Sequence, residues 1–218
     1  CGVVWGKEAI SHYLPVYGRK GDIITQVEGP DIETYGLVKF DFLGLETLNV
    51  IKKVLDAIGK DGKWLENIPL DDDNVYEMLR RSESIGVFQV ESEGMRKTLN
   101  LVQPTCFDDI IAIVALYRPG PMQYLELYAN RKHGRGKPSY PHPSAEEILA
   151  PTYGIMVYQE QVMQLSRALA NFSRGDSDVL RKAIGKKKMD LMKKMEEQFK
   201  SGCVEHSGMD PQKVSKLW

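Results

Sequence analysis

The chain has 218 residues, of which 42% are hydrophobic and 27% are charged, a balance typical of a folded globular protein. No stretch approaches the ~18 apolar residues of a membrane-spanning helix, so we expect no role inside a bilayer. The net charge of −1 is unevenly spread: residues 1–109 hold 12 basic and 19 acidic side chains, whereas residues 110–218 hold 17 and 11. This asymmetry indicates an acidic part and a part that contacts anions.

The three cysteines, Cys1, Cys106 and Cys203, are odd in number and far apart. This spacing fits neither a disulfide framework nor a zinc site, so we expect a reducing, cytoplasmic environment. Because residue 1 is Cys rather than Met, we also expect the chain to be a fragment of a longer protein.

Residues 1–43 are predicted to form short strands and turns, and the clearest strand covers residues 37–43. Its side chains alternate, so three apolar residues share one face of the strand while Lys39 and Asp41 share the other. An acid in this position can bind a divalent metal, and an ammonium beside it can neutralise a phosphate. The alternative is a surface ion pair worth ~0–1 kcal/mol.

From Leu45 onward the apolar residues follow helical spacing through most of the chain. Helices are predicted near residues 45–58, 73–79, 95–102, 110–116, 159–170, 176–184, 192–199 and 211–218, with a short strand over 86–90. The acidic run at residues 71–73 is more typical of a helix start than of a metal cluster. The predicted fold is therefore α+β and mainly α, with a small head at residues 1–45 and a helical body after it.

The strongest anion signal lies in residues 181–194, which hold seven basic side chains and one acid. Gly185 would let the backbone approach a phosphate closely. We expect this segment to contact phosphate or nucleic acid, with a solvated helix face as the alternative. The candidate residues are Arg181, Lys182, Lys186, Lys187 and Lys188.

A second basic segment is predicted to be a loop that contains Arg131, Lys132, Arg135 and Lys137. Loops of this kind hold the DNA backbone without reading its sequence. A loop that is basic only for solubility is the alternative.

Several segments together resemble the alpha subunit of bacterial DNA polymerase III, the C-family replicative polymerase. They are Val38–Leu45, Gly86–Ser92, Ala115–Pro121, Asn130–Gly134, Pro151–Met163 and Gly185–Lys188. The segments occur in the family's order and extend over essentially the whole chain.

The resemblance implies that residues 1–45 are the C-terminal part of the palm, a mixed sheet of the nucleotidyltransferase type. Residues 46–218 would then be the N-terminal part of the helical fingers. Asp41 matches the third of three palm aspartates that hold two Mg²⁺ ions, and Lys39 matches a lysine beside that site. No Asp-x-Asp pair precedes Asp41 to supply the other two carboxylates, so we expect the chain alone to be inactive.

The resemblance also implies roles for the two basic segments. Arg181 matches a fingers arginine that binds the incoming triphosphate, and Lys182 and Lys186 would assist it. The residues expected to bind DNA are Arg131, Lys132, Arg135, Lys137, Lys187 and Lys188.

The implied activity is DNA-directed DNA polymerisation by two-metal phosphoryl transfer, with Asp41 and Lys39 as catalytic residues. The implied partners are primer–template DNA, deoxynucleoside triphosphates and the other replicase subunits: a sliding clamp, a proofreading subunit and a clamp loader. Two alternatives stay open, an error-prone paralogue of the same family and a non-catalytic helical module that binds nucleic acid.

Overall fold

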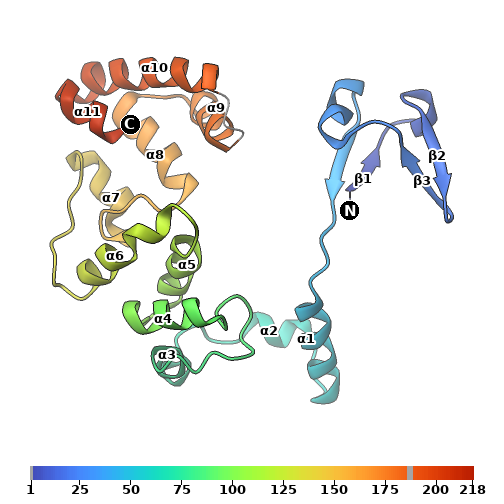
Figure 1. Cartoon of the computed structure of the whole chain (residues 1–218), viewed down its shortest axis with the longest axis horizontal. Helices are drawn as coiled ribbons and strands as arrows, with labels where there is room; N and C mark the ends of the chain where they lie inside the picture. Colours follow the sequence, from blue (N-terminus) through green and yellow to red (C-terminus); the bar gives the residue numbers. More distant parts are fainter. Residues whose placement is uncertain (1, 186–188) are drawn as a thin grey trace. The chain divides into compact units, whose positions relative to one another are not determined.

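The computed structural model describes residues 2–185 and 189–218, and the chain forms two compact units, Cys1–Ile68 and Pro69–Trp218 (Figure 1). The first unit contains the strands and two helices, and the second unit is helical. The predicted α+β, mainly α fold class is therefore confirmed. None of the helices within the described residues is both long enough and apolar enough to cross a membrane.

The strands of the first unit form two ladders: β1 (Gly2–Trp5) with β4 (Val38–Asp41), and β2 (Val16–Arg19) with β3 (Asp22–Thr25). Both ladders are antiparallel, so the strands of the described residues do not form the mixed sheet that we expected. A two-residue turn joins β2 to β3, and both of its residues, Lys20 and Gly21, have positive φ. This is the type I′ geometry, whose twist matches that of the paired strands.

The β1–β4 register places Gly2 opposite Asp41 and Val4 opposite Lys39. These four residues share one face of the ladder, because side chains alternate along each strand. Val4 packs from this face against the small core of the unit, which consists of Leu14, Ile32 and Leu37.

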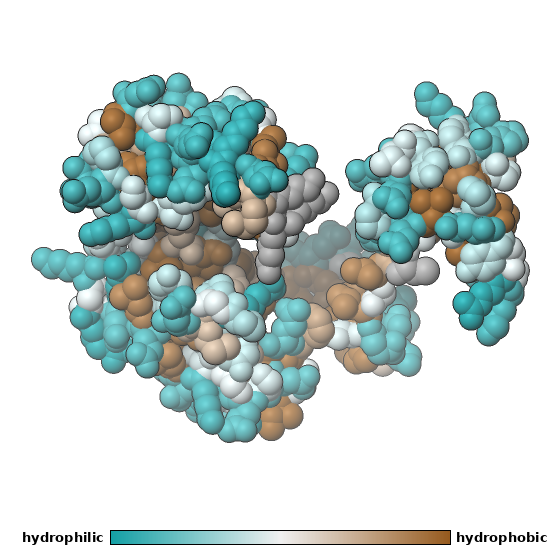
Figure 2. Space-filling model, turned by 45° about the horizontal axis from the view of Figure 1, so that its top comes forward, coloured by the Kyte–Doolittle hydropathy of each residue, from teal (hydrophilic) through white to brown (hydrophobic). Residues whose placement is uncertain are grey.

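The other face of the ladder is apolar and exposed. Its residues are Val3, Trp5, Val38, Phe40 and Phe42. Figure 2 shows hydrophobic residues on the surface of this unit. The predicted apolar face is therefore present, but among residues 2–68, which the structure describes, no core covers it.

The helices of the first unit are α1 (Glu46–Ala57) and α2 (Gly62–Glu66), and a 3₁₀ helix (Gly29–Tyr35) precedes β4. The helices of the second unit are α3 (Asp73–Arg80), α4 (Glu93–Val102), α5 (Phe107–Leu116), α6 (Leu125–Lys132), α7 (Glu146–Leu149), α8 (Gln159–Ala170), α9 (Arg174–Gly185), α10 (Met189–Ser207) and α11 (Pro211–Leu217). The predicted helices are confirmed.

Side-chain caps explain several of the helix starts. At α9, Asp176 N donates to Ser173 Oγ over 3.1 Å, and Ser173 N donates to the Asp176 carboxylate over 3.1 Å. At α11, Asp210 accepts from the backbone N–H groups of Gln212 and Lys213. Each cap satisfies N–H groups that have no partner inside the helix.

The short strand predicted over residues 86–90 is wrong. This segment forms turns, and both Gly86 and Gln89 have positive φ. The Ser84 hydroxyl closes the segment by donating to the Val90 carbonyl over 2.6 Å. The apolar residues that suggested a strand thus belong to a compact loop.

Two hydrophobic clusters organise the second unit. One is built mainly from α3–α6 and includes Leu99, Ile113 and Tyr128. The other is built mainly from α7–α11 and includes Leu169 and Phe199. In the second cluster, α8 and α10 approach closely at Gly202, where an added Cβ would lie 2.3 Å from the Ala170 carbonyl oxygen.

Gly202→Ala should therefore destabilise the chain by about 1–3 kcal/mol, because the extra methyl group forces α10 away from the end of α8. Gly175→Ala is the matched control: it also lies in a helix, but its added Cβ would have no neighbour closer than 3.6 Å. Urea unfolding followed by circular dichroism measures both variants. Equal stability of the two variants would contradict the close approach.

Candidate phosphate and metal sites

Lys39 and Asp41 lie side by side on β4, as predicted. The Lys39 ammonium is 3.4 Å from Asp41 Oδ1, and the two side chains are 35% and 60% exposed. A carboxylate oxygen is the ligand type that Mg²⁺ prefers, and this one is accessible. Asp41 therefore suits a magnesium ion as a single ligand.

The remaining ligands of such an ion are not supplied nearby. Within residues 2–185 and 189–218, no group of three or more His, Cys, Asp or Glu side chains could hold a metal. Asp41 alone does not form a complete metal site.

On α9, Arg181 and Lys182 both pair with one acid. Arg181 Nε and Nη2 donate to Asp178 Oδ1 over 3.1 and 2.8 Å, and Lys182 Nζ lies 2.7 Å from Asp178 Oδ2. The hydrogen bond from Lys182, followed by those from Arg181, lowers the pKa of the Asp178 carboxyl. Asp178 thus stays ionised and an incoming phosphate must compete with it for the two cations.

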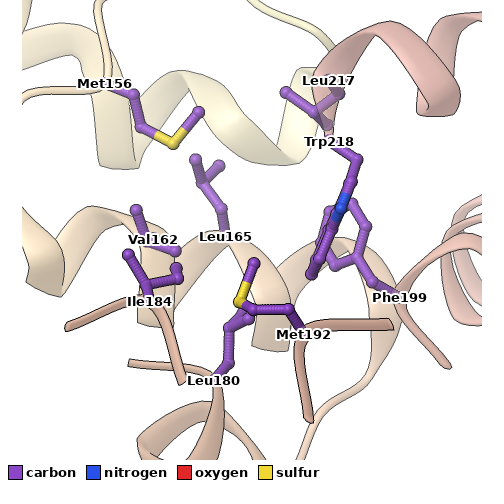
Figure 3. A pocket seen from close by; sticks show the side chains of 9 residues that line it. All are labelled: Met156, Val162, Leu165, Leu180, Ile184, Met192, Phe199, Leu217 and Trp218. Carbon is purple, nitrogen blue, oxygen red and sulfur yellow. The ribbon is translucent and has the colours of Figure 1, made fainter. Parts of the chain in front are cut away.

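A different side of α9 faces an apolar pocket of about 190 Å³ (Figure 3). Leu180 and Ile184 line it from α9, together with residues of α8, α10 and α11. Successive helix residues are rotated by about 100°, so Arg181 and Lys182 lie on other faces of α9 than Leu180. The apolar contacts hold the helix while its basic side chains stay accessible.

The second basic segment is only partly a loop, since α6 extends to Lys132. Arg131 Nη1 donates to the Tyr153 carbonyl over 2.9 Å. The Lys132 side chain is only 7% exposed and lies 3.2 Å from the Asp109 carboxylate. Arg135 and Lys137 follow the helix and are exposed. Arg131 and Lys132 are therefore held by contacts within the chain, whereas Arg135 and Lys137 are accessible to solvent.

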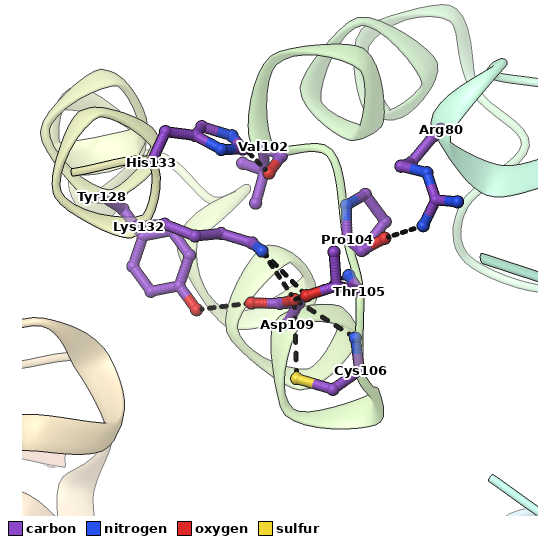
Figure 4. Close-up of polar contacts among 9 residues, drawn as sticks. All are labelled: Arg80, Val102, Pro104, Thr105, Cys106, Asp109, Tyr128, Lys132 and His133. Atoms are coloured by element: carbon purple, nitrogen blue, oxygen red, sulfur yellow. Dashed lines mark hydrogen bonds and ion pairs between the residues drawn. The ribbon is translucent and has the colours of Figure 1, made fainter. Parts of the chain in front are cut away.

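Asp109 is the centre of a buried polar network between α5 and α6 (Figure 4). Its carboxylate accepts hydrogen bonds from Thr105 N over 2.8 Å, Cys106 N over 3.3 Å and the Tyr128 hydroxyl over 3.3 Å. Lys132 completes the network by also donating to Thr105 Oγ1 over 3.0 Å.

The network keeps Asp109 charged. Burial by itself would raise the pKa of the Asp109 carboxyl, but the hydrogen bond from Thr105 N and the charge of Lys132 outweigh it, and the pKa lies below its ordinary 3.8. Burial, and then the nearby charge of Asp109, raises the pKa of the Tyr128 hydroxyl. Sequence reasoning missed Asp109, although an acid at the third position of a helix is a known capping signal.

The other predicted residues of the basic segments, Lys186, Lys187 and Lys188, lie outside the described residues. Lys39 and Asp41 belong to the first unit, and the remaining candidates belong to the second.

Comparison with known proteins decides the family. A sequence model of the bacterial DNA polymerase III alpha subunit finger domain matches residues 47–207. The chain belongs to the bacterial DNA polymerase III alpha subunit family. Whole-chain matches to DNA polymerase III subunit alpha are 46% identical for Aquifex aeolicus, 45% for Haemophilus influenzae and 43% for Escherichia coli.

The chain spans only 19–20% of the length of these relatives. The matched finger region contains Arg181 and the residues around α6, whereas Lys39 and Asp41 precede it. The predicted resemblance to the bacterial DNA polymerase III alpha subunit family is confirmed by the family match.

Lys132→Met should lower the free energy of unfolding by about 3–5 kcal/mol, because it leaves the buried Asp109 carboxylate without its cation. Lys137→Met, which removes an exposed lysine five residues later, should change it by no more than ~0.5 kcal/mol. Urea titration of the 218-residue chain compares them. If both variants were as stable as the unchanged chain, Lys132 would not be part of a stabilising network.

Proposed function

We propose that this chain forms the end of the palm and the first part of the fingers of a replicative DNA polymerase. The whole protein would add deoxynucleotides to a primer 3′ end in the bacterial cytoplasm. The observation that carries this proposal is the 43–46% identity to polymerase III alpha subunits along the entire chain. Its partners would be primer–template DNA, deoxynucleoside triphosphates, a sliding clamp, a proofreading subunit and a clamp loader.

We place the boundary between palm and fingers after residue 45, and the finger match, which begins at residue 47, supports this position. The first compact unit extends further, to Ile68, because it includes α1 and α2. The two helices would therefore belong to the fingers by sequence while forming part of the strand-containing unit.

In this proposal Asp41 is one of three carboxylates that hold two Mg²⁺ ions, and the other two come from residues outside this chain. When bound, the metal ions activate the primer hydroxyl and neutralise charge on the transferred phosphate. Asp41 contributes an accessible oxygen from a strand, which fixes its direction. Lys39 contributes a positive charge 3.4 Å from that carboxylate, suited to a neighbouring phosphate.

Arg181 and Lys182 are proposed to bind the incoming triphosphate, with Lys186. Arginine holds two phosphate oxygens at once, and charge-assisted hydrogen bonds of this kind are among the strongest in proteins. In the described state Asp178 holds both cations, which orients them before a nucleotide arrives. The exchange of one carboxylate for a more highly charged phosphate favours binding.

Arg135 and Lys137 are proposed to follow the DNA backbone, as are Lys187 and Lys188. Lys132 is removed from this set because its side chain is buried against Asp109. Arg131 is also engaged, since its guanidinium bonds to the Tyr153 carbonyl.

Arg181→Ala in the full-length subunit should lower the efficiency of nucleotide incorporation roughly ten- to a hundredfold, as expected for the loss of one charged contact. The combined variant Arg135→Ala and Lys137→Ala should instead weaken DNA binding. It should also flatten the salt dependence of binding by about one unit per lost phosphate contact. Steady-state kinetics and a salt titration of DNA affinity separate the two effects.

The two variants serve as controls for each other. If Arg181→Ala weakened DNA binding as steeply as the loop variant and left nucleotide kinetics unchanged, the proposed role of Arg181 would be wrong.

A further inference from the structure

Two glycines lie against the Lys39 side chain. A Cβ added at Gly2 would lie 3.0 Å from Lys39 Cε and 3.2 Å from Asp41 Oδ1. A Cβ added at Gly29, at the start of the 3₁₀ helix, would lie 3.2 Å from Lys39 Nζ. All three distances are shorter than an ordinary van der Waals contact, so any other residue at either position would push on Lys39.

The backbone does not explain these glycines. Gly21 and Gly36 have φ values of 92° and 71°, which favour glycine. Gly29 does not have positive φ, so other residues can adopt its backbone conformation, and Gly2 lies in the regular antiparallel ladder of β1 with β4. Glycine also weakens a strand, and in strands it often marks a place where another group must approach closely. The group that approaches here is the Lys39 side chain.

The Lys39–Asp41 ion pair does not hold the ammonium in place by itself. A pair as exposed as this one is worth only ~0–1 kcal/mol, and a lysine side chain has many rotamers. Packing along a narrow path restricts those rotamers. The Lys39 side chain passes Gly2 at its Cε atom, and its ammonium lies beside Gly29. Because neither glycine has a side chain, the two residues leave just enough room for the lysine.

We propose that Gly2 and Gly29 are positioning residues that seat the Lys39 side chain and keep its ammonium beside Asp41. The inference rests on the proposed role of Lys39 and Asp41 in phosphoryl transfer. It adds that the reaction depends on where the Lys39 ammonium lies as well as on its charge. Gly2 and Gly29, which have no side chains, fix that position. The group recognised by this charge is a phosphate next to the carboxylate.

The fold should tolerate alanine at both positions. The nearest atom to a new Cβ belongs to the flexible Lys39 side chain at both positions, Cε at Gly2 and Nζ at Gly29, and at Gly2 the next is an oxygen of the exposed Asp41 side chain. Both side chains can move at little cost. The substitution should therefore displace the ammonium while leaving the ladder intact. Gly18→Ala is the matched control, because Gly18 also lies in a strand without positive φ and an added Cβ would have no neighbour within 4 Å.

A first experiment measures the environment of the Lys39 side chain directly in the 218-residue chain. The Lys39 side-chain signals, ¹³Cε and ¹⁵Nζ, are recorded by NMR and assigned with Lys39→Arg. Gly2→Ala and Gly29→Ala should each shift these signals and leave most backbone amide signals in place, whereas Gly18→Ala should shift neither. Unchanged Lys39 signals in both glycine variants would overturn the proposal.

A second experiment tests the functional consequence in the full-length subunit with a double-mutant cycle. Gly29→Ala is the variant for this cycle, because its added Cβ would meet only Lys39, whereas a Cβ at Gly2 would also meet Asp41. Gly29→Ala should lower kcat/KM for nucleotide incorporation roughly ten- to a hundredfold, the scale of a misplaced catalytic group, and in a Lys39→Met background it should have no further effect. An equal loss in both backgrounds would show that Gly29 acts through the backbone and would overturn the inference.

Different results would contradict the proposed role of Lys39 in the reaction and its proposed positioning by Gly2 and Gly29. A Lys39→Met variant with full activity would overturn the proposed role of Lys39 in the reaction. The NMR shifts would then still decide whether the glycines seat its side chain. Loss of activity in Lys39→Met with full activity in both glycine variants would overturn the positioning role alone.

Discussion

The pairing register of β1 with β4 determines which chemical groups of the first unit can act together. It sets Gly2 opposite Asp41 and Val4 opposite Lys39, so an acid, a cation and an open position share one face. A slip of one residue would exchange this face for the apolar one. Alternation along β4 places Lys39 beside Asp41, and the register then fixes the position of this pair against Gly2.

A buried carboxylate has a comparable role in the second unit. Asp109 connects the start of α5 to α6 through Tyr128 and Lys132. The ion pair buries the charge of Lys132, which the sequence alone suggested was part of an accessible basic segment. α6 ends at Lys132, and the exposed Arg135 and Lys137 follow it. One segment thus contains a buried cation in a polar network and, a few residues later, two exposed cations that are proposed to contact DNA.

Much of this was predictable from local sequence. Alternation in residues 37–43 predicted the shared face of Lys39 and Asp41, because strand periodicity is a local property. The position of Lys132 was not predictable, since its partner Asp109 lies 23 positions earlier in the sequence and meets it only through tertiary packing. The turns over residues 86–90 were missed because hydrophobic content alone does not reveal the positive φ of Gln89.

A Mn²⁺ titration of the full-length subunit, followed by electron paramagnetic resonance, tests most directly whether Asp41 holds a metal ion. Asp41→Asn should weaken Mn²⁺ binding at least about tenfold, because it removes one charged ligand, whereas Asp71→Asn in the acidic run at residues 71–73 should leave the affinity unchanged. Unchanged Mn²⁺ affinity in Asp41→Asn would contradict the assignment of the Lys39–Asp41 face as the metal-facing side of the ladder.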